Sequence, residues 1–220
     1  SDTAAYSGAT ENYTVIDTGG GIFTVTDNVG TDGVDTLTGI EFLTFSDGTV
    51  SLTGGPIELT NGDDDYTGTA AGETINALAG DDTVRGEGGN DIIDGGSGRD
   101  VLYGDEGDDT LIGGNLRVSD YLDGGPGADS LNGGAGSDWA YYNSAGTGVT
   151  VNLGDATLNT GDAAGDTYIS IENVLGTNFA DNITGDSGNN FIRSLGGADT
   201  LTGGDGNDTW LAGSSDSGTD

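Results

Sequence analysis

The residues best placed to do chemistry are aspartates that recur every nine positions among glycines. In the successive stretches GEGGNDIID, GGSGRDVLY and GDEGDDTLI, the sixth position holds Asp91, Asp100 and Asp109 in turn. A carboxylate is a hard oxygen ligand for a cation, and the glycine-rich turn beside it offers more oxygens from its backbone carbonyls. A pair of carboxylates can also act in acid–base chemistry. The rest of the sequence distinguishes between cation binding and acid–base chemistry.

The composition excludes several kinds of chemistry and points to a cation. The 220 residues include 38 acidic residues, 4 arginines and no lysine, so the formal net charge is −34. Such a chain should repel itself, and nucleic acid or an anionic membrane would be a poor partner because both need basic patches. Cysteine and histidine are absent, which excludes thiolates, disulfides and the commonest general base. No apolar run approaches the roughly 20 residues of a membrane span, so we expect no membrane insertion.

The chain is built from a repeat of nine residues. Residues 59–141 divide into nine units, of which the seventh has two extra residues, and residues 176–211 give four more. Position six is acidic in twelve of the thirteen units, with Asn190 as the exception, and position eight is apolar or aromatic in all thirteen. We expect positions seven to nine to form a short strand and the first six to form a turn. One unit cannot bury its single apolar residue, so two units should make a coil and the coils should stack with parallel strands.

Four units match one pattern at every specified position. GGSGRDVLY, GGPGADSLN, GGAGSDWAY and GGDGNDTWL follow GGxGxDxUx, where U is apolar or aromatic. This pattern resembles the nonapeptide of the RTX (repeats in toxin) family of hemolysin-type calcium-binding proteins. The resemblance implies an all-β chain that folds as a right-handed parallel β-roll, a kind of β-solenoid, and binds several Ca²⁺ ions. It also implies export by a type I secretion apparatus and a secreted, extracellular or bacterial cell-surface location.

The stacking places the position-six carboxylates in pairs along each edge of the roll. Unit n lies beside unit n+2, and two adjacent anions disfavour each other's ionisation, a cost that a divalent cation removes. Six to eight oxygens in adjustable geometry suit Ca²⁺ better than Mg²⁺. We predict nine inter-turn sites, with Asn190 opposite Asp208 in one of them and these side-chain ligands: Asp64, Glu73, Asp82, Asp91, Asp100, Asp109, Asp120, Asp129, Asp138, Asp181, Asp199 and Asp208. The expected backbone carbonyl ligands are Gly80, Gly89, Gly95, Gly98, Gly104, Gly107, Gly127 and Gly197.

The nine predicted sites should differ in quality. We expect the best four at Asp64/Asp82, Asp82/Asp100, Asp91/Asp109 and Asp109/Asp129. Weaker sites are expected at the longer Glu73, at Asp120 after the inserted LRVS, at Asp181 beside Phe179, and at the uncharged Asn190. The position-five acids Asp63, Asp81 and Asp108 are expected to face solvent.

The acidic residues allow several other interpretations. They could be turn formers and solubilisers on a roll without metal. An EF-hand over NGDDDYTGTAAGE fails because it lacks glycine at the sixth position and glutamate at the twelfth. Carboxylate pairs can hydrolyse glycosidic bonds, but these lie at repeat spacing, so we expect no enzyme activity. The main alternative to a calcium-dependent folding module is a calcium-rigidified structural or adhesive module that binds a polysaccharide or itself.

Two segments interrupt the repeats, and they resemble each other. DTLTGIEFL at 35–43 matches DTYISIENV at 166–174, and each follows a stretch of alternating apolar and polar residues. We expect residues 1–58 and 142–175 to form β segments, as wider coils that introduce the repeat blocks 59–141 and 176–212. Whether the two blocks stack into one roll stays open at this point.

The remaining stretches give smaller expectations. Trp139, Tyr141 and Tyr142 are expected to plug the open end of the first block, FSDGTV at 45–50 to form a hairpin turn, and 213–220 to be a flexible tail. The chain begins without methionine, and neither a signal peptide nor a C-terminal secretion signal is recognised, so we expect an excerpt of a larger protein.

Overall fold

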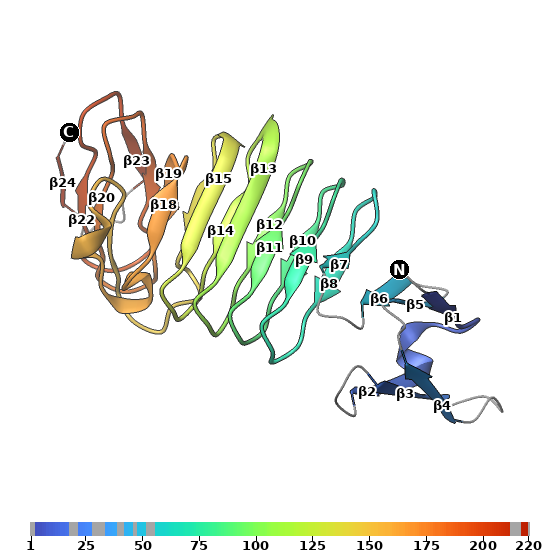
Figure 1. The fold of residues 1–220 in the computed structure, drawn as a ribbon. Helices are drawn as coiled ribbons and strands as arrows, with labels where there is room; N and C mark the ends of the chain where they lie inside the picture. Colours follow the sequence, from blue (N-terminus) through green and yellow to red (C-terminus); the bar gives the residue numbers. More distant parts are fainter. Residues whose placement is uncertain are drawn as a thin grey trace. The chain divides into compact units, whose positions relative to one another are not determined.

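A computed structural model describes residues 3–17, 22–27, 34–38, 42–45, 48–51, 56–211 and 217–219. The chain divides into two units, residues 1–59 and residues 60–220, each of which has its own arrangement of strands. The described residues are almost entirely strands and turns, with three short 3-10 helices (Figure 1). No helix among them is long and apolar enough to cross a membrane.

The second unit is a parallel β-roll, which confirms the predicted fold class. One sheet has eight strands, in chain order β8 (Asp65–Thr67), β10 (Thr83–Arg85), β12 (Val101–Tyr103), β14 (Tyr121–Asp123), β16 (Trp139–Tyr141), β19 (Asn173–Leu175), β21 (Phe191–Arg193) and β23 (Thr209–Leu211). A second sheet contains β9 (Thr74–Asn76), β11 (Ile92–Asp94), β13 (Thr110–Val118), β15 (Ser130–Gly136) and β18 (Thr167–Ile169). A third contains β17 (Thr150–Asn152), β20 (Asn182–Thr184), β22 (Thr200–Thr202) and β24 (Ser217–Thr219).

The register of the strands confirms that two units make one coil. Val84 pairs with Leu102, and Ile93 pairs with Leu111, so each repeat lies beside the repeat two units later. The position-eight side chains fill the core, as predicted, and these are fully buried: Ile75, Val84, Ile93, Leu102, Leu111, Leu122, Leu131, Ala140, Ile183, Ile192 and Leu201. The first and last strands of the eight-stranded sheet carry Tyr66 and Trp210, which are only half-buried because each has a neighbouring strand on one side alone.

Residues 142–175 join the two repeat blocks into one continuous roll. Strand β19 pairs with β16 of the first block and with β21 of the second, which answers the question that the sequence left open (Figure 1). The segment also contains β17, β18 and the 3-10 helices η2 (Ala156–Leu158) and η3 (Gly161–Ala163), so this coil is wider than a pair of nonapeptides. Together with β16 and the two residues before it, the segment forms the coil of residues 137–175, which we call the wide coil.

Two local expectations about this unit are wrong. Trp139 and Tyr141 do not plug an end of the roll, because strand β19 stacks directly on β16 and leaves no open end there. They are half-buried, whereas Tyr142 is buried inside the wide coil. Of the tail that was expected to be flexible, Ser217–Thr219 form β24 beside β22, because they continue the parallel ladder of that sheet. Residues 212–216 and 220 lie outside the described residues.

The first unit has two small sheets. Strands β2 (Tyr13–Asp17), β3 (Ile22–Asp27) and β4 (Val34–Thr38) form an antiparallel sheet, and β1 (Thr3–Ala5), β5 (Phe42–Phe45) and β6 (Gly48–Ser51) form a mixed one. A 3-10 helix η1 (Thr10–Asn12) precedes β2, and β7 (Ile57–Glu58) ends the unit. Val25 and Leu43 form its buried core. The antiparallel pairing of β5 with β6 confirms the predicted hairpin, although Ser46 and Asp47 at its tip lie outside the described residues.

Candidate metal centre

The structure brings together both members of all nine predicted pairs. In each pair, the backbone N–H of the earlier position-six residue donates a hydrogen bond to one side-chain oxygen of the later one. The N–H of Asp82 donates to Oδ1 of Asp100 at 3.0 Å, and the N–H of Asp91 donates to Oδ1 of Asp109 at 2.8 Å. The same bond joins Asp64 to Asp82, Glu73 to Asp91, Asp100 to Asp120, Asp109 to Asp129, Asp120 to Asp138, Asp181 to Asp199, and Asn190 to Asp208.

The second oxygen of most of these carboxylates is buried and has no hydrogen-bond partner. This holds for Oδ2 of Asp82, Asp91, Asp100, Asp109, Asp129, Asp138 and Asp208. A buried carboxylate oxygen that has lost its water without gaining a partner is costly. The ladder therefore holds, at regular spacing, carboxylate oxygens without a protein partner, which a cation would satisfy.

The electrostatics of the ladder favour a bound positive charge. Burial raises the pKa of Asp100 to about 7 and that of Asp129 to about 8, with nearby aspartates adding to the effect. Burial likewise raises the pKa of Asp109 and of Asp138 to about 6. A raised carboxyl pKa means that the ionised form is poorly solvated. A divalent cation can take the place of the protons that these carboxyls would otherwise hold.

The glycines of each turn allow backbone carbonyls to approach the same edge. A Cβ added at Gly98 would lie 1.6 Å from the carbonyl oxygen of Gly80, so only glycine fits there. A Cβ at Gly107 would lie 1.6 Å from the carbonyl oxygen of Gly89. A Cβ at Gly104 would lie 2.2 Å from Oδ2 of Asp109, which places that vacant oxygen against the start of its own turn.

Four of the glycines whose carbonyls were expected as ligands have measured close contacts with a neighbouring coil. The carbonyls of Gly80, Gly89, Gly104 and Gly107 lie against the glycine of a neighbouring coil, at the close distances that a Cβ would make impossible. The carbonyls of Gly95, Gly98, Gly127 and Gly197, in equivalent turns, stay a prediction.

Three units differ from the others because a threonine closes the turn. Oδ2 of Asp64 accepts hydrogen bonds from the N–H of Thr60 at 2.9 Å and from its Oγ1 at 2.8 Å. Thr69 also donates from its N–H and its Oγ1 to Glu73, and Thr177 to Asp181, but there the two bonds go to different oxygens of the carboxylate. These threonine-closed units start the rows of carboxylates. Oδ2 of Asp64 therefore has hydrogen-bond partners, whereas Oδ2 of Asp82 has none. The signal in the sequence is threonine at position two, in LTNG, GTAA and GTNF.

Two acidic residues of the ladder were missed because they lie in the wide coil. The N–H of Asp129 donates to Oδ1 of Asp166 at 3.0 Å, and the N–H of Asp138 donates to Oε2 of Glu172 at 2.9 Å. Oδ2 of Asp166 accepts a hydrogen bond from the hydroxyl of the buried Tyr142 at 2.7 Å. The stretches DTYI and ENVL keep the acidic and apolar positions of the repeat without its glycines, which is the signal that could have revealed them.

The position-five residues form a second ladder that runs the opposite way. The N–H of Asp81 donates to Oδ1 of Asp63 at 2.9 Å, and the N–H of Ala128 donates to Oδ1 of Asp108 at 3.0 Å. Here the later unit provides the amide and the earlier unit the carboxylate. These side chains are partly or fully exposed, as expected, but they also connect the coils.

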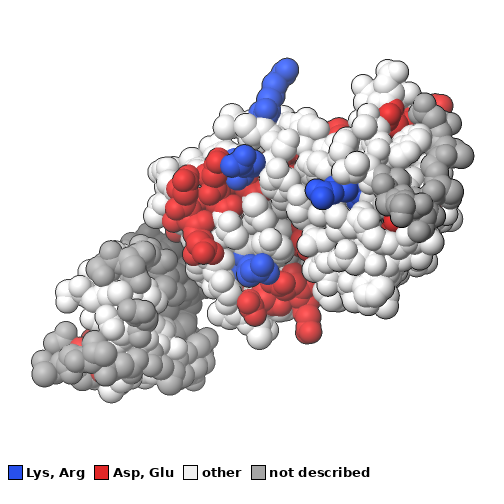
Figure 2. Space-filling model, turned by 180° about the vertical axis from the view of Figure 1, so that it is seen from behind, with Lys and Arg blue, Asp and Glu red and all other residues white. Residues whose placement is uncertain are grey.

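Acidic side chains form clusters on the surface of the roll, with few basic ones among them (Figure 2). The described ion pairs are Arg85 with Asp105 at 3.4 Å and Arg99 with Asp81 at 3.3 Å. In the part of the chain that the structure describes, no three acidic side chains gather into a ready set of metal ligands.

A stacked β-roll with paired aspartates and glycine turns defines a repeat protein of the calcium-binding kind. The model of the RTX calcium-binding nonapeptide repeat matches this chain four times, at residues 67–102, 86–115, 119–144 and 175–209, which together cover half of it. The chain therefore belongs to the RTX calcium-binding repeat family, and its repeats bind several Ca²⁺ ions. A search of the curated proteins found no match.

Proposed function

We propose that the chain is a calcium-dependent folding module of a larger protein that leaves the cell through a type I secretion apparatus. The row of buried Oδ2 atoms without a partner supports this most strongly. These oxygens and the carbonyls near them come from different coils, so they meet only when the chain folds. The free energy of calcium binding is then free energy of folding.

The charge of the chain supports the same switch. Where calcium is scarce, a net charge of −34 favours an extended chain, which suits passage through a narrow channel. Where calcium is plentiful, one ion in each of nine sites would reduce the formal net charge to about −16. The ligands that we propose are the twelve acidic side chains of the predicted pairs and the turn carbonyls, with the threonine-closed units as the metal-poor ends of the rows.

Far-UV circular dichroism tests the switch. The metal-stripped chain is titrated with Ca²⁺, and Mg²⁺ serves as the control because it prefers a tight octahedron and keeps its water. We expect a cooperative change from coil to β structure with Ca²⁺ alone. A spectrum that is already β-rich in chelator would contradict the proposal.

One observation favours a second candidate function, adhesion to a polysaccharide by a calcium-rigidified rod. Aromatic rings from β14, β16 and β21 gather on one sheet of the roll: the ring centroids of Tyr121 and Tyr141 are 5.2 Å apart, those of Trp139 and Tyr141 5.9 Å, and those of Trp139 and Phe191 5.5 Å. All four side chains are half-buried, so part of each remains accessible. Aromatic faces can stack on the apolar faces of sugar rings.

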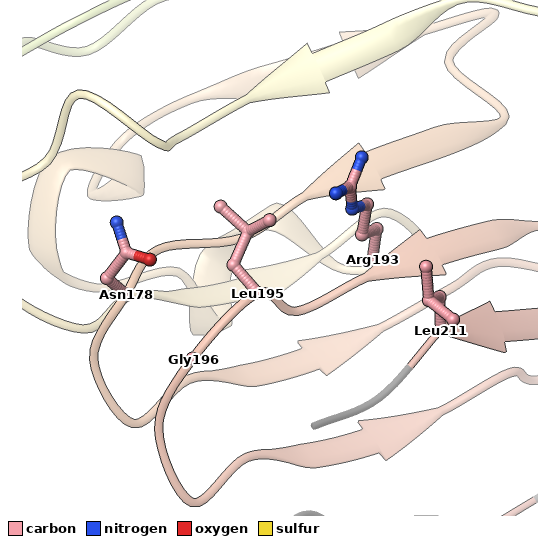
Figure 3. A pocket seen from close by; sticks show the side chains of 5 residues that line it. All are labelled: Asn178, Arg193, Leu195, Gly196 and Leu211. Atoms are coloured by element: carbon pink, nitrogen blue, oxygen red, sulfur yellow. The ribbon is translucent and has the colours of Figure 1, made fainter. Parts of the chain in front are cut away.

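A hollow lies at the end of the same sheet. It has a volume of about 330 Å³ and is lined by Asn178, Arg193, Leu195, Gly196 and Leu211 (Figure 3). Arg193 makes no ion pair with any residue that the structure describes, so its guanidinium is available to an acidic or hydroxyl-bearing ligand.

Polysaccharide binding in calcium tests this second candidate. We expect Trp139→Ala to weaken binding, whereas Ile92→Ala on the opposite sheet should leave it unchanged. If no acidic or neutral polysaccharide binds, and sedimentation shows no self-association in calcium, the adhesive candidate fails and the folding module stands alone.

A further inference from the structure

Two tyrosines in different units of the chain make the same pair of contacts. Tyr142 donates from its N–H to the carbonyl of Leu175 at 2.9 Å and from its hydroxyl to Oδ2 of Asp166 at 2.7 Å. Tyr6 donates from its N–H to the carbonyl of Thr44 at 2.7 Å and from its hydroxyl to Oδ2 of Asp35 at 3.2 Å. The sequences SDTAAY at 1–6 and SDWAYY at 137–142 share four of six residues, and both tyrosines are the sixth.

The strands around the two tyrosines also correspond. Strand β1 pairs in parallel with β5, with Ala4 opposite Leu43, just as β16 pairs with β19 and sets Ala140 opposite Val174. Leu43 and Val174 are both fully buried. Strand β4 corresponds to β18 at the sequence offset of 131 residues that relates DTLTGIEFL to DTYISIENV. The first unit therefore contains a second copy of the framework of the wide coil.

A nonapeptide repeat covers the wide coil in the second unit. Strand β15, from the repeat at 124–132, pairs in parallel with β18 and sets Ser130 opposite Thr167 and Leu131 opposite Tyr168. The amide of Asp129 in that repeat reaches Asp166, which is 1% exposed as a result.

Among the residues that the structure describes, no strand covers the matching surface of the first unit. Strand β4 is the edge strand of its described sheet, with β3 on one side. Asp35, the counterpart of Asp166, is exposed, and the neighbouring Val34 is 63% exposed. An exposed strand edge offers unpaired N–H and C=O groups to another strand.

We propose that the free edge of β4, together with the carboxylate of Asp35, is a docking surface for an RTX nonapeptide repeat. The docked repeat adds a parallel strand against Thr36–Thr38, in the register that residues 130–132 take against Thr167–Ile169. Its position-six amide donates to Asp35 as Asp129 donates to Asp166, and its position-eight side chain packs beside Leu37. The first unit then binds a repeat through this surface, which is a role beyond calcium-dependent folding of the roll.

A graft tests this docking in the full chain. Residues 124–136, GGPGADSLNGGAG, are copied directly ahead of Ser1, in the position that they hold ahead of Ser137. Hydrogen exchange of the segment 34–38 is then measured in calcium, with and without the graft. We expect exchange to slow about tenfold or more, because new ladder hydrogen bonds must open first. The matched control is a graft whose leucine, the copy of Leu131, is replaced by aspartate, and it should give no protection.

A longer graft keeps the test decisive if thirteen residues are too few to order themselves. It copies residues 104–136 ahead of Ser1 and so brings several coils. Unchanged exchange at 34–38 with both grafts, while 83–103 stays protected in the same sample, overturns the docking proposal alone. Protection of 83–103 that does not depend on calcium overturns the proposed folding switch alone, and exchange at 34–38 still reports on docking. Protection of 34–38 without any graft, rising with protein concentration, would instead assign the surface to a second copy of the chain and overturn a repeat as occupant.

Discussion

Replacement of Asp109 by asparagine separates the role of a vacant carboxylate oxygen from the role of a hydrogen bond. The amide oxygen of asparagine can still accept the N–H of Asp91, and the side chain keeps its size. The variant loses the ionised Oδ2, which is buried without a protein partner. Any loss of stability that depends on calcium therefore reports on a ligand and not on packing.

The expected magnitude follows from the place of Asp109 in the ladder. It belongs to two predicted pairs, with Asp91 and with Asp129. A site filled at about 100 times its dissociation constant contributes about 2.7 kcal/mol, so two weakened sites reduce the free energy of unfolding by up to about 5 kcal/mol. In chelator, where the chain is expected to be mostly coil, the variant should leave the residual β structure unchanged or raise it, because burial raises the pKa of Asp109 to about 6 and its ionised form is poorly solvated at pH 7.

Urea unfolding followed by circular dichroism in saturating calcium measures the first value, and the circular dichroism signal in chelator without urea measures the second. The matched control is Asp108→Asn, which makes the same change of charge at an exposed neighbour, and the amide oxygen can still accept the N–H of Ala128. We expect the control to change stability by less than about 0.5 kcal/mol. A loss of residual β structure in chelator, or equal losses of unfolding free energy for the two variants in calcium, would refute the assignment of Asp109 as a ligand.

Three further outcomes are expected. Gly98→Ala should prevent close stacking and lower the unfolding free energy by more than about 2 kcal/mol in urea titrations, since the φ of Gly98 is +138° and the new Cβ would meet the Gly80 carbonyl. Gly88→Ala should be tolerated, because the atom nearest to its Cβ would be 3.7 Å away. Leu102→Ala should cost about 2–5 kcal/mol in the same assay because its side chain is fully buried, and Val101→Ala on the outer face should cost less. In chelator, residual β structure measured by circular dichroism should be greatest below the ordinary carboxyl pKa of about 4. It should decline as the pH rises through about 7 and 8, because Asp100 and Asp129 lose their protons there, whereas the unfolded chain has already released them at lower pH. Calcium binding should strengthen over the same range and release protons, and a metal-free roll that gains stability as the pH rises would contradict the raised pKa values.

The sequence predicted the regular part of the roll because one constraint repeats there. An apolar residue at position eight can be buried only by stacking, and this fixes the two-unit coil and the pairing of Asp82 with Asp100. Those pairs, the core and the turns are found as expected. The vacant oxygens could not be predicted individually, because they depend on whether a threonine such as Thr60 reaches the carboxylate.

The contacts in the irregular parts were harder to predict, because residues outside the nonapeptide pattern make the ladder hydrogen bonds there. Asp166 lies 37 residues after Asp129 and still accepts its amide, since the wide coil inserts β17 and two 3-10 helices before the ladder resumes. Spacing alone gives no sign of this. The resemblance of the segments at 35–43 and 166–174 was visible, but its meaning depended on contacts such as that of Tyr6 with Asp35.

The two ladders of opposite direction have a consequence for how such a chain can change its length. The paired position-six amides donate to the coil after them, and the position-five amides of Asp81, Arg99, Asp108, Ala128 and Asn207 donate to the coil before them. A whole coil can therefore be added or removed in the middle while the coils on either side of it make the same kinds of ladder hydrogen bond with their new neighbours. Only the ends need special chemistry, such as the turn that Thr60 closes over Asp64. The roll has no intrinsic length: it can grow by whole coils of about 4.8 Å each without any new interface.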